Sequence, residues 1–342
     1  MADLSSDTTA AIHPAIMEAM AAVNTGYAPA YGNDAPSRQL IDTLRQVFDY
    51  PDLVAFPVFN GSACNSTALA ALVRPHQSII AHAHSHLAES ECGMPQTFSG
   101  GSLVTVGGDD GKVSVEEVCA HLRFALGHVP HSPRPAALSI AQSTEAGTVY
   151  TPQEIAALAE AVKPQGLRLH MDGARFANAV AHLNCRPADI TWRAGIDVLS
   201  LGGTKNGAML AEAVVFFDPA LAVDFAYTRK RLGQLPTKQR FIAAQFLALF
   251  QDDLWLRNAA HANAMAARLA QGLKAAGIEV LKPVESNAVF PVLSPALAER
   301  LRQQGHAFYG WPGFGPNAYR LLTSFSTTAD EIDAFVADCR AG

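Results

Sequence analysis

Short apolar runs alternate with helical patterns between about residue 35 and residue 220 of this chain. Segment 37–48, SRQLIDTLRQVF, repeats apolar residues at helical spacing, whereas segment 53–59, LVAFPVF, is an uninterrupted apolar run with the length of a buried strand. Six further segments have the composition of strands: 78–82, 102–106, 136–142, 167–172, 197–201 and 212–217. This alternation predicts an α/β fold in which helices cover both faces of a mostly parallel sheet of the seven-stranded type.

After Phe217 the pattern changes to three long helical segments: 222–233, 238–250 and 254–277. Three strand-like segments follow and predict a smaller C-terminal α/β domain: 278–283, 288–293 and 319–325. We place the boundary in a helix around residues 238–262. The predicted organisation is an N-terminal arm (1–32), a large domain (33–240) and a small domain (241–342).

Composition narrows the class of protein. The chain has 342 residues, 49% hydrophobic and 16% charged, and its net charge of −6 with a pI near 6.0 argues against a sequence-independent nucleic-acid binder. No apolar run approaches the ~18 residues of a membrane span, and the N-terminus lacks the basic-then-apolar order of a secretory signal, so we expect a cytoplasmic protein. The five cysteines are dispersed without zinc-site spacing, and we expect them to be reduced and mostly buried.

The most informative stretch is 197–207, DVLSLGGTKNG, in which an apolar run ends in small residues that present Lys205. The preceding strand-like segment is followed in the same way by Asp172 and Arg175. Pyridoxal phosphate enzymes need a lysine that holds the cofactor aldehyde and a carboxylate that keeps the pyridine nitrogen protonated. The alternatives are a solvated loop lysine and an aspartate that caps a helix; the glycines do not satisfy a P-loop pattern.

Two further segments carry candidate chemistry. The turn Gly61-Ser62-Ala63 lies between a predicted strand and a helix, where backbone N–H groups and the helix dipole favour a phosphate. The residues His82, His84 and His86 alternate and would share one face of an extended segment, as in a metal site. No neighbouring cysteine or acidic residue completes a familiar ligand pattern, so we expect no metal.

Six motifs resemble, in the same order along the chain, those of the low-specificity L-threonine aldolases of the aspartate-aminotransferase-like pyridoxal phosphate superfamily. They are YGND (31–34), NGSACN (60–65), HLAESECG (86–93), QSTEAGTVYTP (142–152), HMDGAR (170–175) and GGTKNG (202–207). The resemblance covers nearly the whole chain. It implies fold type I of these enzymes, pyridoxal 5'-phosphate as cofactor, and aldol cleavage of β-hydroxy-α-amino acids.

The resemblance also implies roles for individual residues near the cofactor. It selects Lys205 as the Schiff-base lysine, Asp172 as the partner of the pyridinium, and His86 as the side chain stacked on the ring and a candidate base for the substrate β-hydroxyl. The same match gives the phosphate cradle as Gly61, Ser62 and Ala63. Lys238 matches only approximately a basic residue that reaches the phosphate.

Substrate contacts are implied in the same way. Arg320 matches the small-domain arginine that anchors the substrate carboxylate, and its planar fork suits that task. Ser6 and Lys230 match further carboxylate contacts, while Arg175 is placed to reach the cofactor O3′ or the substrate carboxylate. Tyr31 corresponds to a pocket tyrosine from a neighbouring subunit, which implies a homodimer at least, and commonly a dimer of dimers.

Glu145 is the main departure from the family pattern, because many members have histidine at this place. A carboxylate is a weaker base unless burial raises its pKa, so the assignment of the hydroxyl base and the distinction between threo and erythro substrates stay open. The alternatives for the reaction are a specialist phenylserine aldolase or transaldolase, a β-eliminating lyase or aminotransferase, and a non-catalytic cofactor-binding regulator. The regulator lacks support, since the chain keeps the lysine, the aspartate and the carboxylate anchors together.

Overall fold

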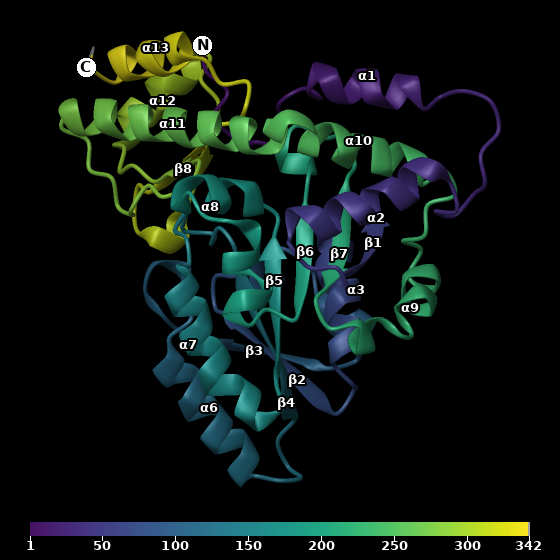
Figure 1. The fold of residues 1–342 in the computed structure, drawn as a ribbon. Coiled ribbons are helices and arrows are strands. Elements are labelled where there is room, and N and C mark those ends of the chain that lie inside the picture. The colour runs from purple at the N-terminus through teal and green to yellow at the C-terminus, as the bar shows by residue number, and fades with distance from the viewer. Residues whose placement is uncertain (341–342) are drawn as a thin grey trace.

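A computed structural model describes residues 1–340 and contains two sheets (Figure 1). The larger sheet has the strand order β1-β7-β6-β5-β4-β2-β3, and β7 is antiparallel to both of its neighbours while the other pairs are parallel. Its strands are β1 (Val54–Val58), β2 (Gln77–His82), β3 (Ser102–Val106), β4 (Arg134–Ala141), β5 (Arg168–Gly173), β6 (Val198–Gly202) and β7 (Glu212–Phe216). The predicted seven-stranded, mostly parallel sheet is therefore confirmed, with strand ends within two residues of the predicted segments.

Helices cover both faces of this sheet (Figure 1). One face packs against α2 (Ala35–Val47), α6 (Val115–Gly127), α7 (Pro152–Val162), α8 (Phe176–Leu183) and α10 (Arg240–Phe250). The other face packs against α3 (Gly61–Leu72) and α9 (Phe225–Arg231). Both layers bury a near-continuous run of apolar strand residues, which is the pattern that parallel strands require.

The smaller sheet has the order β8-β10-β9, with β8 (Ala288–Val289), β9 (Tyr309–Gly310) and β10 (Tyr319–Leu322). It packs with α11 (Leu254–Ala275), α12 (Pro295–Gln303) and α13 (Ala329–Arg340) around a second apolar core. Segment 278–283 was predicted as a strand and contributes only an isolated bridge between Val280 and Pro291.

The boundary predicted inside one helix around residues 238–262 is wrong in one respect, because the chain breaks there. A 3-10 turn at Gln251–Asp253 separates α10 from α11, and Asp252 and Asp253 adopt positive φ angles of 50° and 54°. Helix α11 then serves both cores, since Ala259 lies in the first and Leu269 in the second. The division into 1–32, 33–240 and 241–342 stays a proposal. Within α11, the N-terminal part packs in the first core and the C-terminal part packs in the second.

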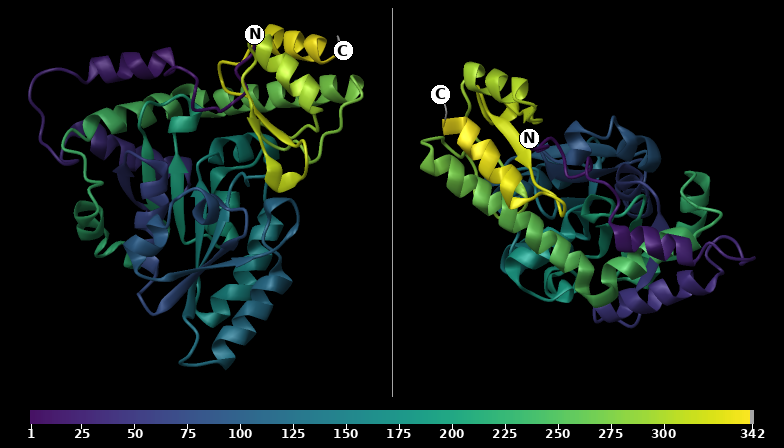
Figure 2. Two further views of the ribbon diagram at one scale, coloured as in Figure 1. Left: turned by 180° about the vertical axis from the view of Figure 1, so that it is seen from behind. Right: turned by 90° about the horizontal axis from the view of Figure 1, so that it is seen from above.

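The N-terminal arm runs between the two cores (Figure 2). Leu4 donates its backbone N–H to Ala307 and accepts one from Leu322, so the arm begins against the small sheet. The chain then crosses to α1 (Pro14–Ala22), which lies beside α10, and His13 donates its N–H to the carbonyl of Gly207 near Lys205. The arm therefore reaches the edge of the sheet where the candidate lysine lies.

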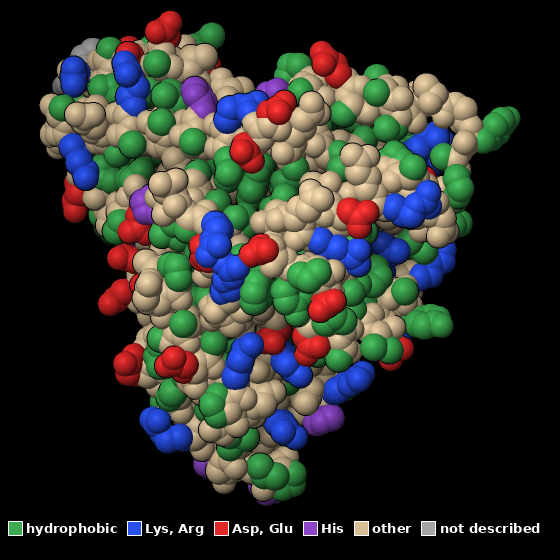
Figure 3. Space-filling model, viewed as in Figure 1, with side chains coloured by type: hydrophobic (Ala, Val, Ile, Leu, Met, Phe, Trp, Pro, Cys, Tyr) green, Lys and Arg blue, Asp and Glu red, His purple; other side chains and the backbone are tan. Residues whose placement is uncertain are grey.

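The surface carries both signs of charge. Figure 3 shows Lys and Arg side chains interspersed with Asp and Glu over the face it presents. Within residues 1–340 no helix is long and apolar enough to cross a bilayer. Of the five cysteines, all unpaired, Cys64 and Cys339 are buried and Cys92 is exposed, so the expectation of mostly buried thiols is only partly met.

Candidate active site

A cavity lies at the carboxyl ends of β5 and β6, where the parallel pairing brings Asp172 and the loop of Lys205 to one edge of the sheet. It is lined by Thr8, Phe59, Asn60, Gly61, Ser62, Asn65, His86, Asp172, Ala174, Ser200, Thr204, Lys205, Leu210 and Glu212. Five residues predicted from the sequence therefore share one cavity: Gly61, Ser62, His86, Asp172 and Lys205. Crevices at the carboxyl ends of parallel strands are where α/β proteins bind their ligands.

Two glycines explain why the chain turns so closely at Lys205. A Cβ at Gly202 would lie 2.7 Å from Ala174 Cα, and one at Gly203 would lie 2.9 Å from the carbonyl oxygen of Ala211. Only glycine permits these approaches without displacement of the backbone. The turn therefore places the 3-10 helix Thr204–Asn206 directly against the loop that follows Asp172.

The ε-amine of Lys205 has no hydrogen-bond or ion-pair partner among the residues that the structure describes. Its loop is fixed instead by the next residue, because Asn206 donates to the carbonyl of Trp255 (2.8 Å) and accepts from Asn258 (3.0 Å). The buried carboxylates of Asp7 and Glu212 lie within electrostatic reach of the amine. A half-buried lysine with a fixed backbone and an uncommitted amine is suited to nucleophilic chemistry on an aldehyde.

Asp172 is buried and oriented by two donors. The amide of Asn65 donates to Oδ2 (2.8 Å), and the backbone N–H of Ala174 donates to Oδ1 (3.0 Å). The alternative role of Asp172 as a helix cap is thus partly correct, because Oδ1 accepts a backbone N–H of the turn that leads into α8. These bonds fix the carboxylate plane at the floor of the cavity.

His86 begins α4 (His86–Glu89) and is held by Glu91, which the sequence analysis did not select. The Nδ1 atom of His86 lies 2.9 Å from Oε1 of Glu91, whose side chain is fully buried. The hydrogen bond with Glu91 raises the pKa of His86 against the effect of burial, and Asp172 and Glu145 add to the rise. Glu91 fixes the ring so that Nε2 is the nitrogen left for contact with a ligand.

The metal site considered for the three histidines does not form, because their chain is not extended. His82 bonds the carbonyl of Gly108, while His84 pairs with Glu89. Ligand atoms of His86, Glu91 and Asp172 do lie within 4.8 Å of one another. The amide nitrogen of Asn65 donates to both carboxylates, at 2.9 and 2.8 Å, so one oxygen of each is already hydrogen-bonded.

The predicted phosphate cradle forms the first turn of α3. Asn60 is its N-cap, with a side-chain oxygen that accepts from the backbone N–H of Ala63 (3.0 Å). The N–H groups of Gly61 and Ser62 point out of the helix end and have no intrahelical acceptor, as at every helix N-terminus. They line the cavity together with Lys205, whereas Ala63 is taken up by the cap.

The two predicted arginines are in different states. Arg175 donates from Nε and Nη2 to Asp7 (2.7 and 3.0 Å) and is nearly buried, so its salt bridge lies in the interior and not on the surface. Arg320 has no acidic partner among residues 1–340; its Nε is buried without an acceptor, and its guanidinium stacks on Trp311 at 4.3 Å. Burial lowers the pKa of Arg320, and the charge of Arg175 lowers it further. An uncommitted guanidinium of this kind needs an anion.

Like Arg175 and Arg320, the remaining predicted contacts lie outside the cavity lining. Ser6 bonds Thr8 (2.8 Å), and Thr8 is the arm residue that reaches the cavity. Tyr31 and Lys230 are exposed and lie together, with the Lys230 amine 5.4 Å from the centroid of the Tyr31 ring. Lys238 is also exposed, and it follows Thr237, whose carbonyl accepts the backbone N–H of Tyr31. Their roles stay proposals.

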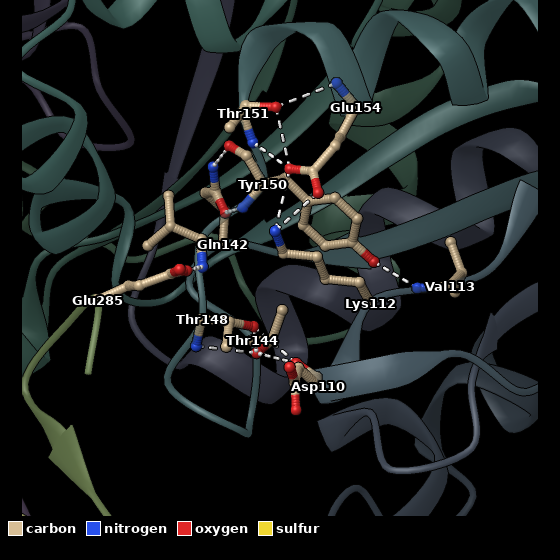
Figure 4. A network of polar contacts seen from close by, with 11 residues as sticks. Asp110, Lys112, Val113, Gln142, Thr144, Thr148, Tyr150, Thr151, Glu154 and Glu285 are labelled. Atoms are coloured by element: carbon tan, nitrogen blue, oxygen red, sulfur yellow. Dashed lines mark hydrogen bonds and ion pairs between the residues drawn. The ribbon is translucent and has the colours of Figure 1, made fainter. Parts of the chain in front are cut away.

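Glu145 lies on the loop 142–151, half-buried and without a hydrogen-bond or ion-pair partner in the described chain. Figure 4 shows the polar network that holds this loop, in which Thr148 donates to the carbonyl of Asp110 (2.6 Å) and Glu285 accepts from the N–H of Val149 (2.7 Å). Glu145 acts electrostatically on His86, Arg175 and Arg320. A fixed loop thus presents a free carboxylate to the group of residues expected to bind substrate.

Glu212 is a further buried carboxylate of the cavity that the sequence analysis missed. Its position in β7 pairs with Val58 and Gly202, so it lies between the strand that leads to the cradle and the strand that leads to Lys205. Burial raises the pKa of Glu212 to about 7, although Thr204 and Lys205 act in the opposite direction. The signal in the sequence was a single acidic residue at the start of an apolar strand.

This pKa leads to a prediction on stability. The folded protein holds the Glu212 proton more tightly than the unfolded chain, so this group's contribution is present below pH 4.5 and is lost as the pH rises to about 7. At ~1.4 kcal/mol per pKa unit the loss is up to roughly 3 kcal/mol. In Glu212→Gln the loss should disappear, measured as the free energy of unfolding of cofactor-free protein from pH 4.5 to 8. Exposed Glu18 provides the control, Glu18→Gln, and parallel pH curves for wild type and Glu212→Gln would contradict the assignment.

Comparison with known proteins agrees with this geometry. The Beta-eliminating lyase family matches residues 3–296. The chain is 42% identical over 342 positions to the low specificity L-threonine aldolase of Pseudomonas sp. (strain NCIMB 10558), covering 98% of this chain and 96% of that protein. The solved threonine aldolase of Leishmania major superposes with a TM-score of 0.93 at 30% identity over 99% of both chains. Serine palmitoyltransferase of Sphingomonas wittichii, at 15% identity and a TM-score of 0.73, shares the fold.

Fold and site together define a lyase built on the scaffold of pyridoxal phosphate enzymes. The chain belongs to the Beta-eliminating lyase family, and within it to the low-specificity L-threonine aldolases.

Proposed function

We propose that this protein uses pyridoxal 5'-phosphate to cleave the Cα–Cβ bond of L-threonine, L-allo-threonine and related β-hydroxy-α-amino acids, reversibly, to glycine and an aldehyde. The observation that carries the proposal is the meeting of an uncommitted Lys205 amine, the buried Asp172 carboxylate and the N-terminus of α3 in one cavity. A relative that is 42% identical, over 98% of this chain and 96% of its own length, and bears the name low specificity L-threonine aldolase supports it.

The residues present fit this cofactor. Free N–H groups of Gly61 and Ser62 suit a phosphate, Asp172 suits a protonated ring nitrogen, and the ring of His86 lines the same cavity. When bound, the cofactor supplies an aldehyde for amine exchange and a protonated ring that accepts the electron pair of the breaking bond. The pairing of a cradle with a lysine and an aspartate is difficult to explain by packing alone.

The chain's own residues then perform the remaining tasks. Lys205 would hold the cofactor through its amine until the substrate amino group takes its place, and Asp172 would keep the ring nitrogen protonated. Arg320 would bind the substrate carboxylate and so orient the substrate for cleavage of its Cα–Cβ bond. His86, through Nε2 or a water that it positions, takes the proton of the β-hydroxyl, which expels the aldehyde.

The test is product analysis after incubation with L-threonine, L-allo-threonine and L-phenylserine. Glycine with acetaldehyde or benzaldehyde supports aldol cleavage. Pyruvate, 2-oxobutyrate or ammonia in place of glycine would move the protein to elimination or transamination on the same scaffold. Exclusive use of L-phenylserine would assign the specialist alternative.

A prediction divides the acid–base work between two residues. His86→Asn should lower aldol cleavage by about 100-fold, because a general base contributes roughly that much, while cofactor absorbance persists. Glu145→Gln should change the ratio of threo to erythro activity more than it changes cofactor affinity, and the wild type should accept both epimers. Kinetics with L-threonine and L-allo-threonine measure both effects. The control is His128→Asn, because His128 is exposed and lies away from the cavity. Full activity in His86→Asn, or wild-type turnover of one epimer alone, would contradict this division of the acid–base work between His86 and Glu145.

Assembly and location remain proposals. We infer a homodimer or a dimer of dimers in which Tyr31 of one subunit enters the site of its neighbour, supported by the exposed pair of Tyr31 and Lys230. Lys230 and Lys238 are assigned to carboxylate and phosphate contacts on the same basis. We also propose that the enzyme works in the cytoplasm.

A further inference from the structure

Asp7 of the N-terminal arm is a buried carboxylate at the meeting point of three parts of the chain. Its side chain is 1% exposed and accepts two hydrogen bonds from Arg175, at 2.7 and 3.0 Å. The amide of Asn287, one residue before β8, donates to the same carboxylate at 3.0 Å. One group thus bonds the arm to the start of α8 and to the small sheet.

The charges around Asp7 show why it stays ionised. Burial by itself would raise its pKa, but Arg175 and, less strongly, Lys205 and Asn287 outweigh burial, and the pKa of Asp7 lies below its usual range. Arg320 also lies within electrostatic reach of Asp7. A buried carboxylate that faces three cations balances charge where an anionic substrate is expected to bind.

The bidentate bond leaves Arg175 with a fixed orientation. Asp7 uses Nε and one terminal nitrogen, which sets the plane of the guanidinium and leaves its other edge free. Without this partner, Arg175 and Arg320 would face each other as two buried like charges, and Arg175 already lowers the pKa of Arg320. Asp7, together with the nearby carboxylate of Glu145, therefore offsets the repulsion between these neighbouring arginines.

Through its bond to Asn287, Asp7 is also linked to the strand that carries Arg320. Asn287 also donates its side-chain amide to the carbonyl of Thr323 (2.7 Å), and the backbone N–H of Thr323 returns a bond to Asn287 (3.0 Å). Thr323 directly follows β10, the strand that carries Arg320. The position of Arg320 relative to Arg175 is thus linked through Asp7.

We propose that Asp7 is the positioning residue of the substrate-carboxylate site, acting through Arg175 and Asn287 to hold the two arginines as one anion-binding unit. The proposal rests on the proposed function, which supplies the carboxylate substrate. Asp7 does not line the cavity and is bonded to Arg175 and Asn287, so we expect its effect to fall on binding.

The test compares Asp7→Asn with Asp3→Asn in purified holoenzyme. Asp3 lies on the same arm but is exposed, and its carboxylate bonds its near neighbours in the arm, Ser5 and Thr9. Asp7→Asn should raise KM for L-threonine and the dissociation constant of glycine, read from the change in visible absorbance, by about tenfold, with kcat within threefold of wild type. Asp3→Asn should match wild type, and the melting temperature reports folding in both variants.

A double variant separates positioning from a general loss of structure. If Asp7 acts through Arg175, Asp7→Asn should add little to the loss caused by Arg175→Gln, whereas independent effects would multiply. Unchanged or tighter glycine binding in Asp7→Asn, a loss confined to kcat, or multiplying effects would overturn the proposal. Wild-type protein that produces no glycine from any β-hydroxy amino acid would instead remove the proposed function, and the two failures are thus distinguishable.

Discussion

Lys205→Ala is expected to abolish turnover and to remove the visible absorbance that borohydride treatment abolishes in the wild type. The reason is geometric as well as chemical, because the 3-10 helix Thr204–Asn206 presents this amine to the cavity through a turn that Gly202 and Gly203 alone permit. The loss of kcat/KM should reach about 1000-fold or more, since no other amine lines the cavity within the described residues.

The control is Lys274→Ala, which removes an exposed lysine near the end of α11. It should keep both absorbance and turnover. A wild-type protein that stays colourless after addition of pyridoxal phosphate would contradict the cofactor assignment. Retained turnover in Lys205→Ala would contradict the assignment of this lysine.

Arg320→Ala is expected to lower kcat/KM by about 100-fold or more, and Arg320→Lys by about tenfold or more. Truncation leaves the substrate carboxylate without its charged partner, and the point charge of lysine cannot reproduce a planar bidentate contact. The buried Nε without an acceptor and the stacking on Trp311 indicate a guanidinium held ready for an anion. Steady-state kinetics with L-threonine provide the measurement.

Arg302→Lys is the matched control, because Arg302 is also a small-domain arginine above aromatic rings, at 5.0 Å from Phe308 and 5.5 Å from Tyr319, but is exposed to solvent, whereas Arg320 is half-buried. Its kinetics should equal those of the wild type. An unchanged kcat/KM in Arg320→Ala with an intact fold would remove Arg320 from the substrate site.

Local pattern was sufficient for the main features of this protein. Apolar runs bounded by small residues predicted each strand of the large sheet, because strands buried on both faces must be continuously apolar. Lys205 and Asp172 could be paired from the sequence, since parallel strands release their following residues at one edge of the sheet. The motifs around these two residues were sufficient to identify the family.

Contacts distant in sequence were beyond that reasoning. Asn65 lies inside a quoted motif, yet its bonds to Asp172 and Glu91, which are 107 and 26 residues away, depend on how α3 packs over the sheet. The interruption between segments 238–250 and 254–277 was predicted, but the positive φ angles of Asp252 and Asp253 were not, because their residue type does not demand them.

The sequence by itself determined the α/β class, the family and the lysine–aspartate pair, because each depends on short-range pattern or on strand order. Only the tertiary structure decided that Arg175 is paired with Asp7 while Arg320 is uncommitted, since 168 residues separate Asp7 from its partner. The packing of the N-terminal arm against both cores decides which charged side chains become partners. No short segment of the sequence shows how the arm packs.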